Sequence, residues 1–174
     1  FGYKIDYSNG NGYINTQEEL DNALATYQVG GTPRLGDFLY VDINEDGVID
    51  EKDQAPIKYS DIPRITYGFS GSVNWKNFDF SFLFSGIAKA SRVYTGWGAT
   101  EFGLVGFYSD YHLQAWTAER YANGEEIKYP ALASSPGTSQ KANDFFIMDR
   151  SFLRLKNIEL GYTLPKKLLK KVGI

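Results

Sequence analysis

The chain has 174 residues, with 18 Lys and Arg against 21 Asp and Glu, which gives a formal net charge of −3 at pH 7. Nucleic-acid binding requires a clustered basic surface, so we expect no nucleic-acid partner. The absence of cysteine excludes disulfides and thiolate zinc sites, and the single histidine, His112, leaves little for a histidine-based metal site. Aromatic residues are abundant, with 13 Tyr, 12 Phe and 3 Trp.

The sequence contains no segment suited to a transmembrane helix. Its longest apolar runs, residues 38–41 and 145–148, are far shorter than the about 20 residues that such a helix needs. A transmembrane β-strand needs only about 9–11 residues of alternating character, so membrane strands are still allowed. The chain begins at Phe1 without a signal-like segment and ends at Ile174 after a basic stretch. We therefore expect it to be a piece of a longer protein.

A short helix is predicted over residues 16–28. The sequence fits a capping box, in which the Thr16 hydroxyl and the Glu19 carboxylate satisfy the first backbone amides of the helix. Apolar residues follow at helical spacing, and two adjacent glycines end the pattern. A short strand is predicted next, over residues 37–41, and another short helix near residues 113–121.

Between residues 64 and 88 the apolar period changes to two, which predicts a β-hairpin around the turn Lys76-Asn77. The alternating apolar residues are Ile65, Tyr67, Phe69, Val73 and Trp75 before the turn, and Phe78, Phe80, Phe82 and Phe84 after it. Because Trp75 and Phe78 flank the turn, they should pair and point to the same side of the sheet. The two apolar faces therefore merge into one.

A last strand is predicted over residues 151–164. Its alternation is regular from Ile158 onward, but upstream of that residue the phase shifts by one position. A β-bulge near Lys156-Asn157 would repair the phase. Pro165 ends the strand, and the lysine-rich run after it suits either a turn at a membrane interface or a solvated helix end.

Two architectures fit these strands. In a soluble sandwich, the aromatic face is the buried core of the sheet. In an outer-membrane barrel, the aromatic face meets lipid, and short turns alternate with long loops. The two-residue turn and the loop over residues 89–144 follow that alternation, and the polar face holds Gly, Ser, Thr and Asn instead of Lys and Glu. Composition and periodicity leave both architectures open.

An acidic segment, residues 42–53, follows the calcium-binding pattern of an EF-hand loop. Oxygen ligands at alternating positions allow a curling backbone to aim them at one point, and Gly47 permits the sharp turn. The predicted ligands are Asp42, Asn44, Asp46, the Val48 carbonyl, Asp50 and Asp53. The last position holds Asp53 where the pattern has Glu, and this shorter carboxylate weakens calcium binding or suits magnesium. A strand, and not a helix as in an EF-hand, precedes the loop, so we expect a calcium ion with a structural role. The alternative is an acidic solvated turn.

Several stretches of the sequence resemble the SusC/RagA family of TonB-dependent outer-membrane transporters of Bacteroidota. They are DFLYVD at residues 37–42, ITYGF at residues 65–69, WKNFDFS at residues 75–81 and SFLRLKNIELGYTLP at residues 151–165, with Trp116-Thr117 and Tyr129-Pro130 between them. The resemblance covers most of the chain, and its motifs are specific.

The resemblance implies an all-β fold with minor α content, namely part of an antiparallel transmembrane β-barrel of about 22 strands around a plug. It implies that residues 1–63 form an extracellular loop region, which contains the helix at 16–28 and the metal loop at 42–53. It also implies that residues 64–88 form a hairpin of the barrel. Residues 89–144 would form a long extracellular loop, and residues 145–174 a barrel strand and periplasmic turn. The implied partners are a SusD-like lipoprotein, TonB acting through a plug that this chain lacks, a glycan or peptide substrate, and outer-membrane lipid.

Two other function classes compete with transport. A secreted, calcium-stabilised β module would bind carbohydrate by stacking it on loop aromatics. The candidate aromatics are Trp97, Phe102, Tyr108, Tyr111 and Trp116. A glycosidase would need paired carboxylates, and no spacing selects a pair among Glu101, Glu119, Glu125, Glu126 and Asp144. We therefore expect no enzyme, and we expect His112 in a loop or at the surface. The phenylalanines at 78–84 distinguish the first two classes, because a soluble module must bury them.

Overall fold

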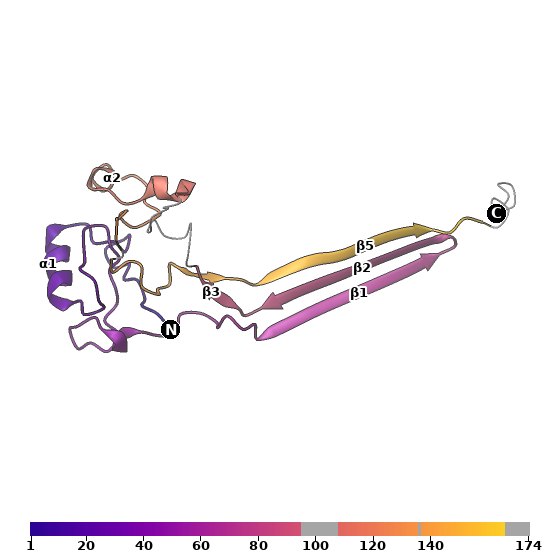
Figure 1. Cartoon of the computed structure of the whole chain (residues 1–174), viewed down its shortest axis with the longest axis horizontal. Helices are drawn as coiled ribbons and strands as arrows, with labels where there is room; N and C mark the ends of the chain where they lie inside the picture. The colour runs from indigo at the N-terminus through magenta and orange to yellow at the C-terminus, as the bar shows by residue number, and fades with distance from the viewer. Residues whose placement is uncertain (95–107, 136, 166–174) are drawn as a thin grey trace. The chain divides into compact units, whose positions relative to one another are not determined.

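The computed structural model describes residues 1–94, 108–135 and 137–165, and it divides into two compact units (Figure 1). The loop unit is Phe1–Lys58 with Val93–Met148, and the sheet unit is Tyr59–Arg92 with Asp149–Ile174. Two short strands, β3 Ser91–Val93 and β4 Ile147–Asp149, pair with each other, and two of the unit boundaries fall within them.

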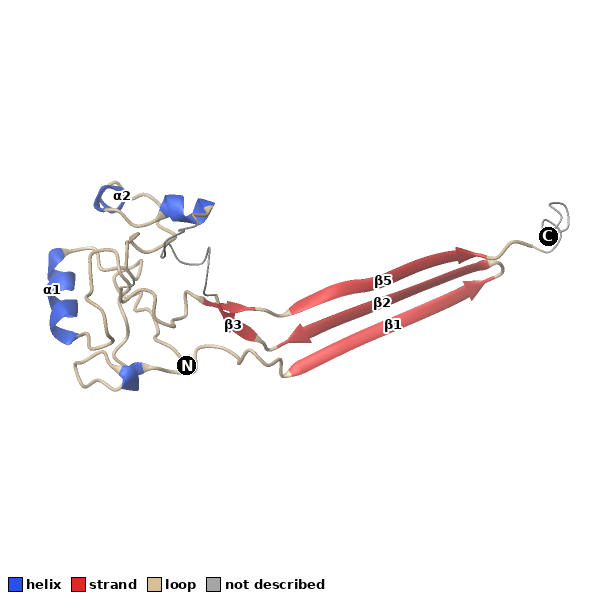
Figure 2. Cartoon of the chain, in the orientation of Figure 1, coloured by secondary structure: helices blue, strands red, loops and turns tan. Residues whose placement is uncertain are grey.

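The sheet unit is an antiparallel sheet of three strands in the order β1-β2-β5 (Figure 2). Its strands are β1 Ile65–Trp75, β2 Phe78–Ala88 and β5 Phe152–Tyr162, each of 11 residues. β1 and β2 form the predicted hairpin, in which Trp75 pairs with Phe78. In the turn, Lys76 has a φ of 56°, a left-handed conformation that two-residue hairpin turns use. Strands of this length match the about 9–11 residues of a transmembrane β-strand.

One face of this sheet is apolar across all of its strands. The cross-strand rows on that face join Trp75 with Phe78 and Tyr162, Val73 with Phe80 and Leu160, and Gly71 with Phe82 and Ile158. The rings of Phe69 and Phe84 also stack there, with centroids 4.8 Å apart. On the opposite face, the row between the second and third of these joins Ser72 with Ser81 and Glu159. The merged apolar face predicted from the hairpin is thus confirmed and extends onto β5.

The pairing of β2 with β5 contains one irregularity. Leu83 pairs with Asn157, but the next residue, Phe84, pairs with Leu155, so Lys156 is an extra residue in β5. The bulge predicted near this point is confirmed. Its effect is to return Leu155 to the apolar face, which strict alternation along β5 would not do.

The described residues of the loop unit form short helices and irregular segments, apart from the ends of β3 and β4. α1 spans Gln17–Thr26 and carries the predicted capping box: the Glu19 N–H donates to Thr16 Oγ1 at 3.2 Å, and the Thr16 N–H donates to Glu19 Oε2 at 3.1 Å. The other helices are η1 Glu51–Asp53, η2 Asp110–Gln114 and α2 Ala118–Ala122. Two short helices, η2 and α2, therefore stand where one was predicted near residues 113–121. Among the described residues, no helix is both long and apolar enough to cross a membrane.

The strand predicted over residues 37–41 is wrong. This segment makes only single bridges, at Phe38 and at Tyr40. The N–H groups of Leu39 and Val41 donate to backbone carbonyls of two different places in the chain, Gly12 at 2.9 Å and Lys4 at 3.0 Å. The Phe38 N–H donates to Ser139 Oγ at 3.0 Å, and the Tyr40 N–H donates to the Tyr27 hydroxyl at 2.7 Å. Alternating apolar residues therefore do not produce a strand here, because the backbone bonds are divided between single bridges and the other donors bond to side chains.

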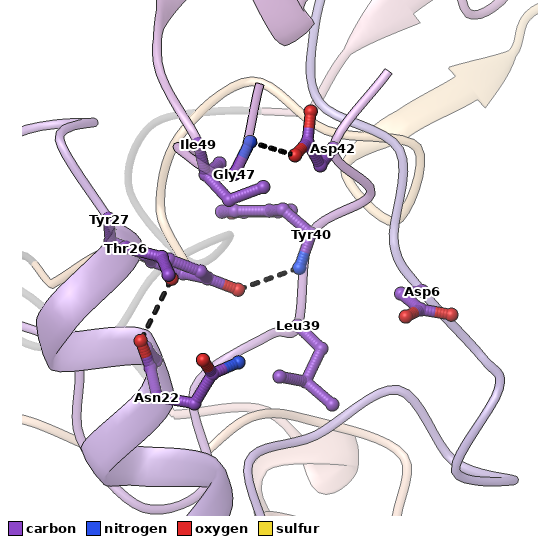
Figure 3. Close-up of a pocket in the computed structure, with 10 residues that line it drawn as sticks. Asp6, Asn22, Thr26, Tyr27, Leu39, Tyr40, Asp42, Gly47 and Ile49 are labelled. Atoms are coloured by element: carbon purple, nitrogen blue, oxygen red, sulfur yellow. Dashed lines mark hydrogen bonds between the residues drawn. The ribbon is translucent and has the colours of Figure 1, made fainter. Parts of the chain in front are cut away.

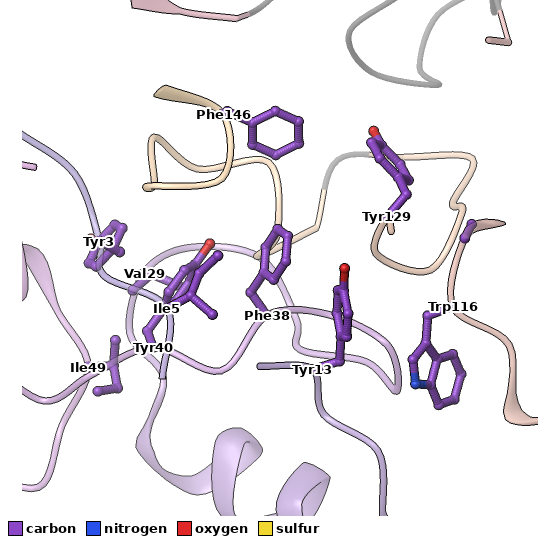
Figure 4. Packing of buried hydrophobic residues seen from close by; sticks show 11 residues of the cluster. Tyr3, Ile5, Tyr13, Val29, Phe38, Tyr40, Ile49, Trp116, Tyr129 and Phe146 are labelled. Carbon is purple, nitrogen blue, oxygen red and sulfur yellow. The ribbon is translucent and has the colours of Figure 1, made fainter. Parts of the chain in front are cut away.

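The core of the loop unit is mostly aromatic (Figure 4). Tyr129 and Phe38 are fully buried within it, at 0% and 1% exposure. The tyrosine hydroxyls inside the core find polar partners, as buried hydroxyls must. The Tyr40 hydroxyl, for example, donates to the Thr138 carbonyl at 2.8 Å and accepts from Asn143 Nδ2 at 3.1 Å. Aromatic residues thus build two different features, this core and the apolar face of the sheet.

Candidate functional site

The apolar face of the sheet is exposed to its surroundings. Leu160 is 75% exposed, Trp75 is 64% exposed and Val73 is 62% exposed. Within the described part of the sheet unit, no second layer of helices or strands packs on this face. A continuous exposed apolar surface that extends over three strands marks contact with a membrane or another apolar partner. The soluble sandwich considered above requires the same residues to be buried.

The acidic loop, residues 42–53, curls around hydrogen bonds from its own backbone to its carboxylates. Asp42 Oδ2 accepts from the Gly47 N–H at 2.8 Å, and Asp46 Oδ1 accepts from the Val48 N–H at 3.0 Å. Gly47 has a φ of 81°, the left-handed conformation that the predicted sharp turn needs. The alternating oxygens of the pattern therefore do curl the backbone as expected.

Asp53 closes the acidic loop. It is fully buried, and its two oxygens accept from the Ile43 N–H and from the Asp50 N–H, both at 2.8 Å. The last residue of the loop is thereby fixed to its second and ninth residues. The bond from the Asp50 N–H is also half of the capping box of η1, so the same carboxylate fixes the helical turn that ends the acidic loop.

One oxygen of Asp42, at the first ligand position, has no partner. Asp42 Oδ1 is buried and accepts no hydrogen bond. Leaving a buried polar group unpaired costs about 1–3 kcal/mol, and more when the group is charged. A cation bound inside the acidic loop would remove this cost. The residue at this position therefore fits a metal ligand.

The remaining candidate ligands are arranged around a lysine. Asn44 Nδ2 donates to Asp46 Oδ2 at 2.9 Å, and Lys52 Nζ lies 3.4 Å from Asp46 and 3.2 Å from Asp50. The pKa of Asp46 is lowered, chiefly by its hydrogen bond with Asn44 and also by Lys52. In the part of the chain that the structure describes, no three His, Cys, Asp or Glu side chains are grouped as a metal site. Lys52 would have to move away for the acidic loop to enclose a cation.

A cavity of about 340 Å³ lies beside the acidic loop (Figure 3). Its walls come from the start of the chain, from the end of α1 and from the segment that enters the loop. Hydrogen bonds hold these walls: Thr26 Oγ1 donates to the Asn22 carbonyl at 2.9 Å, and the Tyr27 hydroxyl accepts from the Tyr40 N–H at 2.7 Å. The sequence did not indicate this cavity, because segments distant along the chain meet to form it.

His112 is buried, so the surface position considered for it is wrong. The residue is 3% exposed and lies in η2, where its Nδ1 accepts from the Ser109 N–H at 2.9 Å. Its ring centroid lies 4.2 Å from that of Tyr111 and 4.5 Å from that of Tyr129. An imidazole enclosed by aromatic rings serves here as a packing residue.

The aromatics proposed to stack on carbohydrate have different environments. Trp116 is 7% exposed, and its indole N–H donates to Asn15 Oδ1 at 3.0 Å, so it is a core residue that cannot present its face to a sugar. Tyr111 packs against Tyr129 with ring centroids 5.4 Å apart, whereas Tyr108 is 66% exposed. Trp97 and Phe102 lie outside the described residues.

Three of the carboxylates considered for catalysis have structural partners. Glu125 pairs with Arg120 at 3.2 Å, and Glu126 pairs with Lys128 at 2.9 Å. Asp144 Oδ1 accepts from the Ile5 N–H at 3.2 Å, and burial is the main cause of its raised pKa. Glu101 lies outside the described residues.

Comparison with known proteins identifies the family. The TonB-dependent receptor P26 of Formosa agariphila is 30% identical over 153 residues, which are 86% of this chain and 14% of that receptor. The TonB-dependent receptor SusC of Bacteroides thetaiotaomicron is 27% identical over 163 residues, 92% of this chain and 14% of SusC. A chain of the RagAB peptide importer in the "open-open" state matches 81% of this chain and 16% of its own length, with a TM-score of 0.52 and 26% identity.

The chain belongs to the SusC/RagA-type TonB-dependent receptors. Its sequence matches no protein-family model. It spans about one-seventh of its curated relatives, at 14% of their length. TonB-dependent receptors are outer-membrane transporters and not enzymes, so the sheet β1-β2-β5 is part of an antiparallel transmembrane β-barrel. The fold class predicted from the sequence, all-β with minor α and a partial barrel, is confirmed.

The two faces of the barrel sheet should respond differently to charge. Ile158 lies mid-strand on the apolar face, and Asn157 precedes it on the opposite face. An arginine on the lipid face near the bilayer centre costs about 2–4 kcal/mol, whereas the lumen face tolerates polar groups. In the full-length receptor, Ile158→Arg should therefore reduce the amount of heat-modifiable barrel in the outer membrane, and Asn157→Arg should not. Equal assembly of the two variants would contradict this assignment of faces.

Proposed function

We propose that the full-length protein imports glycans or peptides across the outer membrane of a Bacteroidota bacterium. In this proposal a SusD-like lipoprotein closes its outer face, and TonB supplies energy through the plug. The observation that carries the proposal is the three-stranded sheet with one continuous, exposed apolar face. Similarity to SusC and to the RagAB peptide importer supports it. This chain would supply part of the barrel wall and part of the loops.

The connections of the sheet support an orientation for the chain. The two residues Lys76 and Asn77 join β1 to β2 at one end of the strands. At the other end, the chain makes its long excursion between Ala88 and Phe152 before β5 begins. Outer-membrane barrels have short periplasmic turns and longer extracellular loops. In the proposal, residues 1–63 and 89–144 are therefore extracellular, and the hairpin turn is periplasmic.

The soluble carbohydrate-binding module receives less support. Such a module has to bury the apolar face of its sheet, yet Leu160 and Val73 on that face are mostly exposed. One of its candidate stacking residues, Trp116, is a core residue.

The import function predicts a specific partner. Tagged full-length receptor, purified in mild detergent from native outer membranes, should carry a SusD-like lipoprotein in a comparable amount. A strain lacking the receptor should fail to grow on at least one polysaccharide or peptide source that the parent strain uses. Receptor purified without a lipoprotein, together with unchanged growth of the deletion strain, would contradict the proposal.

We also propose that the acidic loop binds calcium as a structural ion, with magnesium as the weaker alternative. The unpartnered Asp42 Oδ1 and the EF-hand-like turn at Gly47 support this proposal. The ligands would be those predicted from the sequence: Asp42, Asn44, Asp46, the Val48 carbonyl, Asp50 and Asp53. A divalent ion would displace Lys52 and neutralise the clustered carboxylates, and so stiffen a loop near the lipoprotein.

Hydrogen exchange of the full-length receptor, in calcium and in chelator, tests the calcium proposal. We expect calcium to slow exchange over residues 42–53 in the native receptor, and the effect to disappear in Asp46→Ala, which should also weaken lipoprotein docking while barrel assembly continues. Glu45→Gln, at a position between ligands, should behave like the native protein. Slowing by magnesium alone would assign the ion as magnesium. Exchange that is the same in chelator and in both ions would show that the acidic loop is a solvated turn.

A further inference from the structure

The sequence contains three asparagines that are each followed by glycine, and all of them lie in the loop unit. The pairs are Asn9-Gly10, Asn11-Gly12 and Asn123-Gly124. In such a pair, the backbone nitrogen of the glycine can attack the amide carbon of the asparagine side chain, because glycine has no Cβ to hinder the approach. A five-membered succinimide ring forms, ammonia leaves, and water then opens the ring. The local sequence makes the three pairs equivalent, so only the folded structure distinguishes them.

The side chain of Asn9 is held by four hydrogen bonds. Its Nδ2 donates to the Tyr13 carbonyl at 2.8 Å and to Glu19 Oε1 at 2.9 Å. Its Oδ1 accepts from the Asn11 N–H at 3.3 Å and from the Gly12 N–H at 2.9 Å. Glu19 also closes the capping box of α1, so the amide of Asn9 is tied to the start of that helix. Attack on this amide requires several of these bonds to break together.

Asn11 belongs to the same network and is held by three hydrogen bonds. Its Oδ1 accepts from the Tyr13 N–H at 3.1 Å and from Asn15 Nδ2 at 2.8 Å, and its Nδ2 donates to Asn15 Oδ1 at 3.1 Å. The nucleophile of this pair is bound as well, because the Gly12 N–H donates to Asn9 Oδ1. The fold therefore restrains both pairs near the start of the chain.

Asn123 is much less restrained. It is exposed, and its side chain makes one hydrogen bond, from Nδ2 to Glu125 Oε1 at 3.1 Å. Among the described residues, no donor bonds to its Oδ1. A Cβ atom at Gly124 would meet nothing within 4 Å, so a ring has space to form there.

The nitrogen of Gly124 is freed by a small local opening. Its N–H donates to the Tyr121 carbonyl at 3.1 Å, a bond of the last turn of α2. Asn123 is the C-cap of this helix, which has only five residues. Helix ends fray, and such openings require little free energy. Opening this one turn releases the N–H group and allows the Asn123 backbone to rotate toward the geometry of attack.

We propose that Asn123 is a site of spontaneous deamidation, in which the Gly124 nitrogen attacks the Asn123 side chain after the last turn of α2 opens. A bond forms between the Gly124 nitrogen and Asn123 Cγ, and the bond between Cγ and Nδ2 breaks. Nδ2 leaves as ammonia and takes up the proton of the Gly124 N–H. Water then opens the ring at either carbonyl, which gives aspartate or isoaspartate at position 123. This modification is independent of the proposed import function.

The new carboxylate changes an attraction into a repulsion. The amide of Asn123 donates to Glu125, whereas a carboxylate at that position repels Glu125. Glu125 pairs with Arg120 at 3.2 Å, and Arg120 Nη1 donates to the Leu113 carbonyl of η2 at 2.6 Å. Isoaspartate also lengthens the backbone at the C-cap of α2. Deamidation should therefore loosen α2 and its connection to η2.

Heavy-oxygen water tests the proposal, because each ring opening adds an oxygen atom from water. Full-length receptor in detergent is incubated in this water at mildly alkaline pH, returned to ordinary water and digested with trypsin. Cleavage at basic residues releases residues 121–128 and, separately, residues 5–34 with the other two pairs. Mass spectrometry with fragment sequencing should find label at Asn123 about tenfold or more faster than at Asn9 or Asn11, because one hydrogen bond holds its side chain instead of four or three.

Two controls separate the effect of the fold from that of the sequence. Asn123→Gln, whose longer side chain closes a larger ring far more slowly, should remove the label from residues 121–128. Receptor denatured in urea should take up label at similar rates at all three pairs. Equal rates at the three pairs in the native receptor would overturn the proposal. Unlabelled residues 121–128 in a native receptor whose denatured form takes up label there would overturn it as well.

Discussion

The structure depends on one constraint: the sheet β1-β2-β5 pairs its backbone groups between strands, and one of its faces is apolar and uncovered. Paired strands satisfy their N–H and C=O groups internally, which a membrane requires because hydrocarbon offers no hydrogen-bonding partner. Side chains on the exposed apolar face, such as Leu160 and Trp75, are favourable in lipid and costly in water. The serine-rich opposite face fits a polar lumen. The register of the strands places the apolar residues on one face, as a barrel strand in lipid requires. The similarity to TonB-dependent receptors supports the same conclusion.

The loop unit uses the same types of aromatic residue to build a buried core. It has little regular structure, so side chains satisfy many of its backbone groups. Asn143 is fully buried, and its Oδ1 accepts from the N–H groups of both Phe145 and Phe146 at 3.1 Å. Asp37 accepts from the hydroxyls of Ser139 and Thr138 at 2.8 and 3.1 Å, and burial raises its pKa despite these bonds. The Asp37 contacts join residues about one hundred positions apart.

The sequence predicted features that depend on near neighbours. The hairpin, the capping box at Thr16 and the bulge at Lys156 each follow from a local pattern, and the structure contains all three. The strand over residues 37–41 was predicted wrongly because its backbone donors bond to scattered carbonyls and to side chains such as Ser139, which the local pattern does not reveal. Trp116 is buried for a related reason, because its indole N–H donates to the distant Asn15. The acidic loop was visible as a pattern, but the cavity beside it, with Asn22, Tyr27 and Tyr40 among its walls, arises only in the folded chain.

Spin labels on β5 would test the central claim most directly, because the two faces of the sheet alternate along this strand. Single cysteines at positions 157 to 162 of the full-length receptor in lipid bilayers would carry the labels. Barrel membership predicts that labels at 158, 160 and 162 collide with oxygen dissolved in lipid, and that labels at 157, 159 and 161 collide with a water-soluble nickel reagent. Labels at 158 and 160 that are reached by the nickel reagent, or by neither probe, would contradict the account.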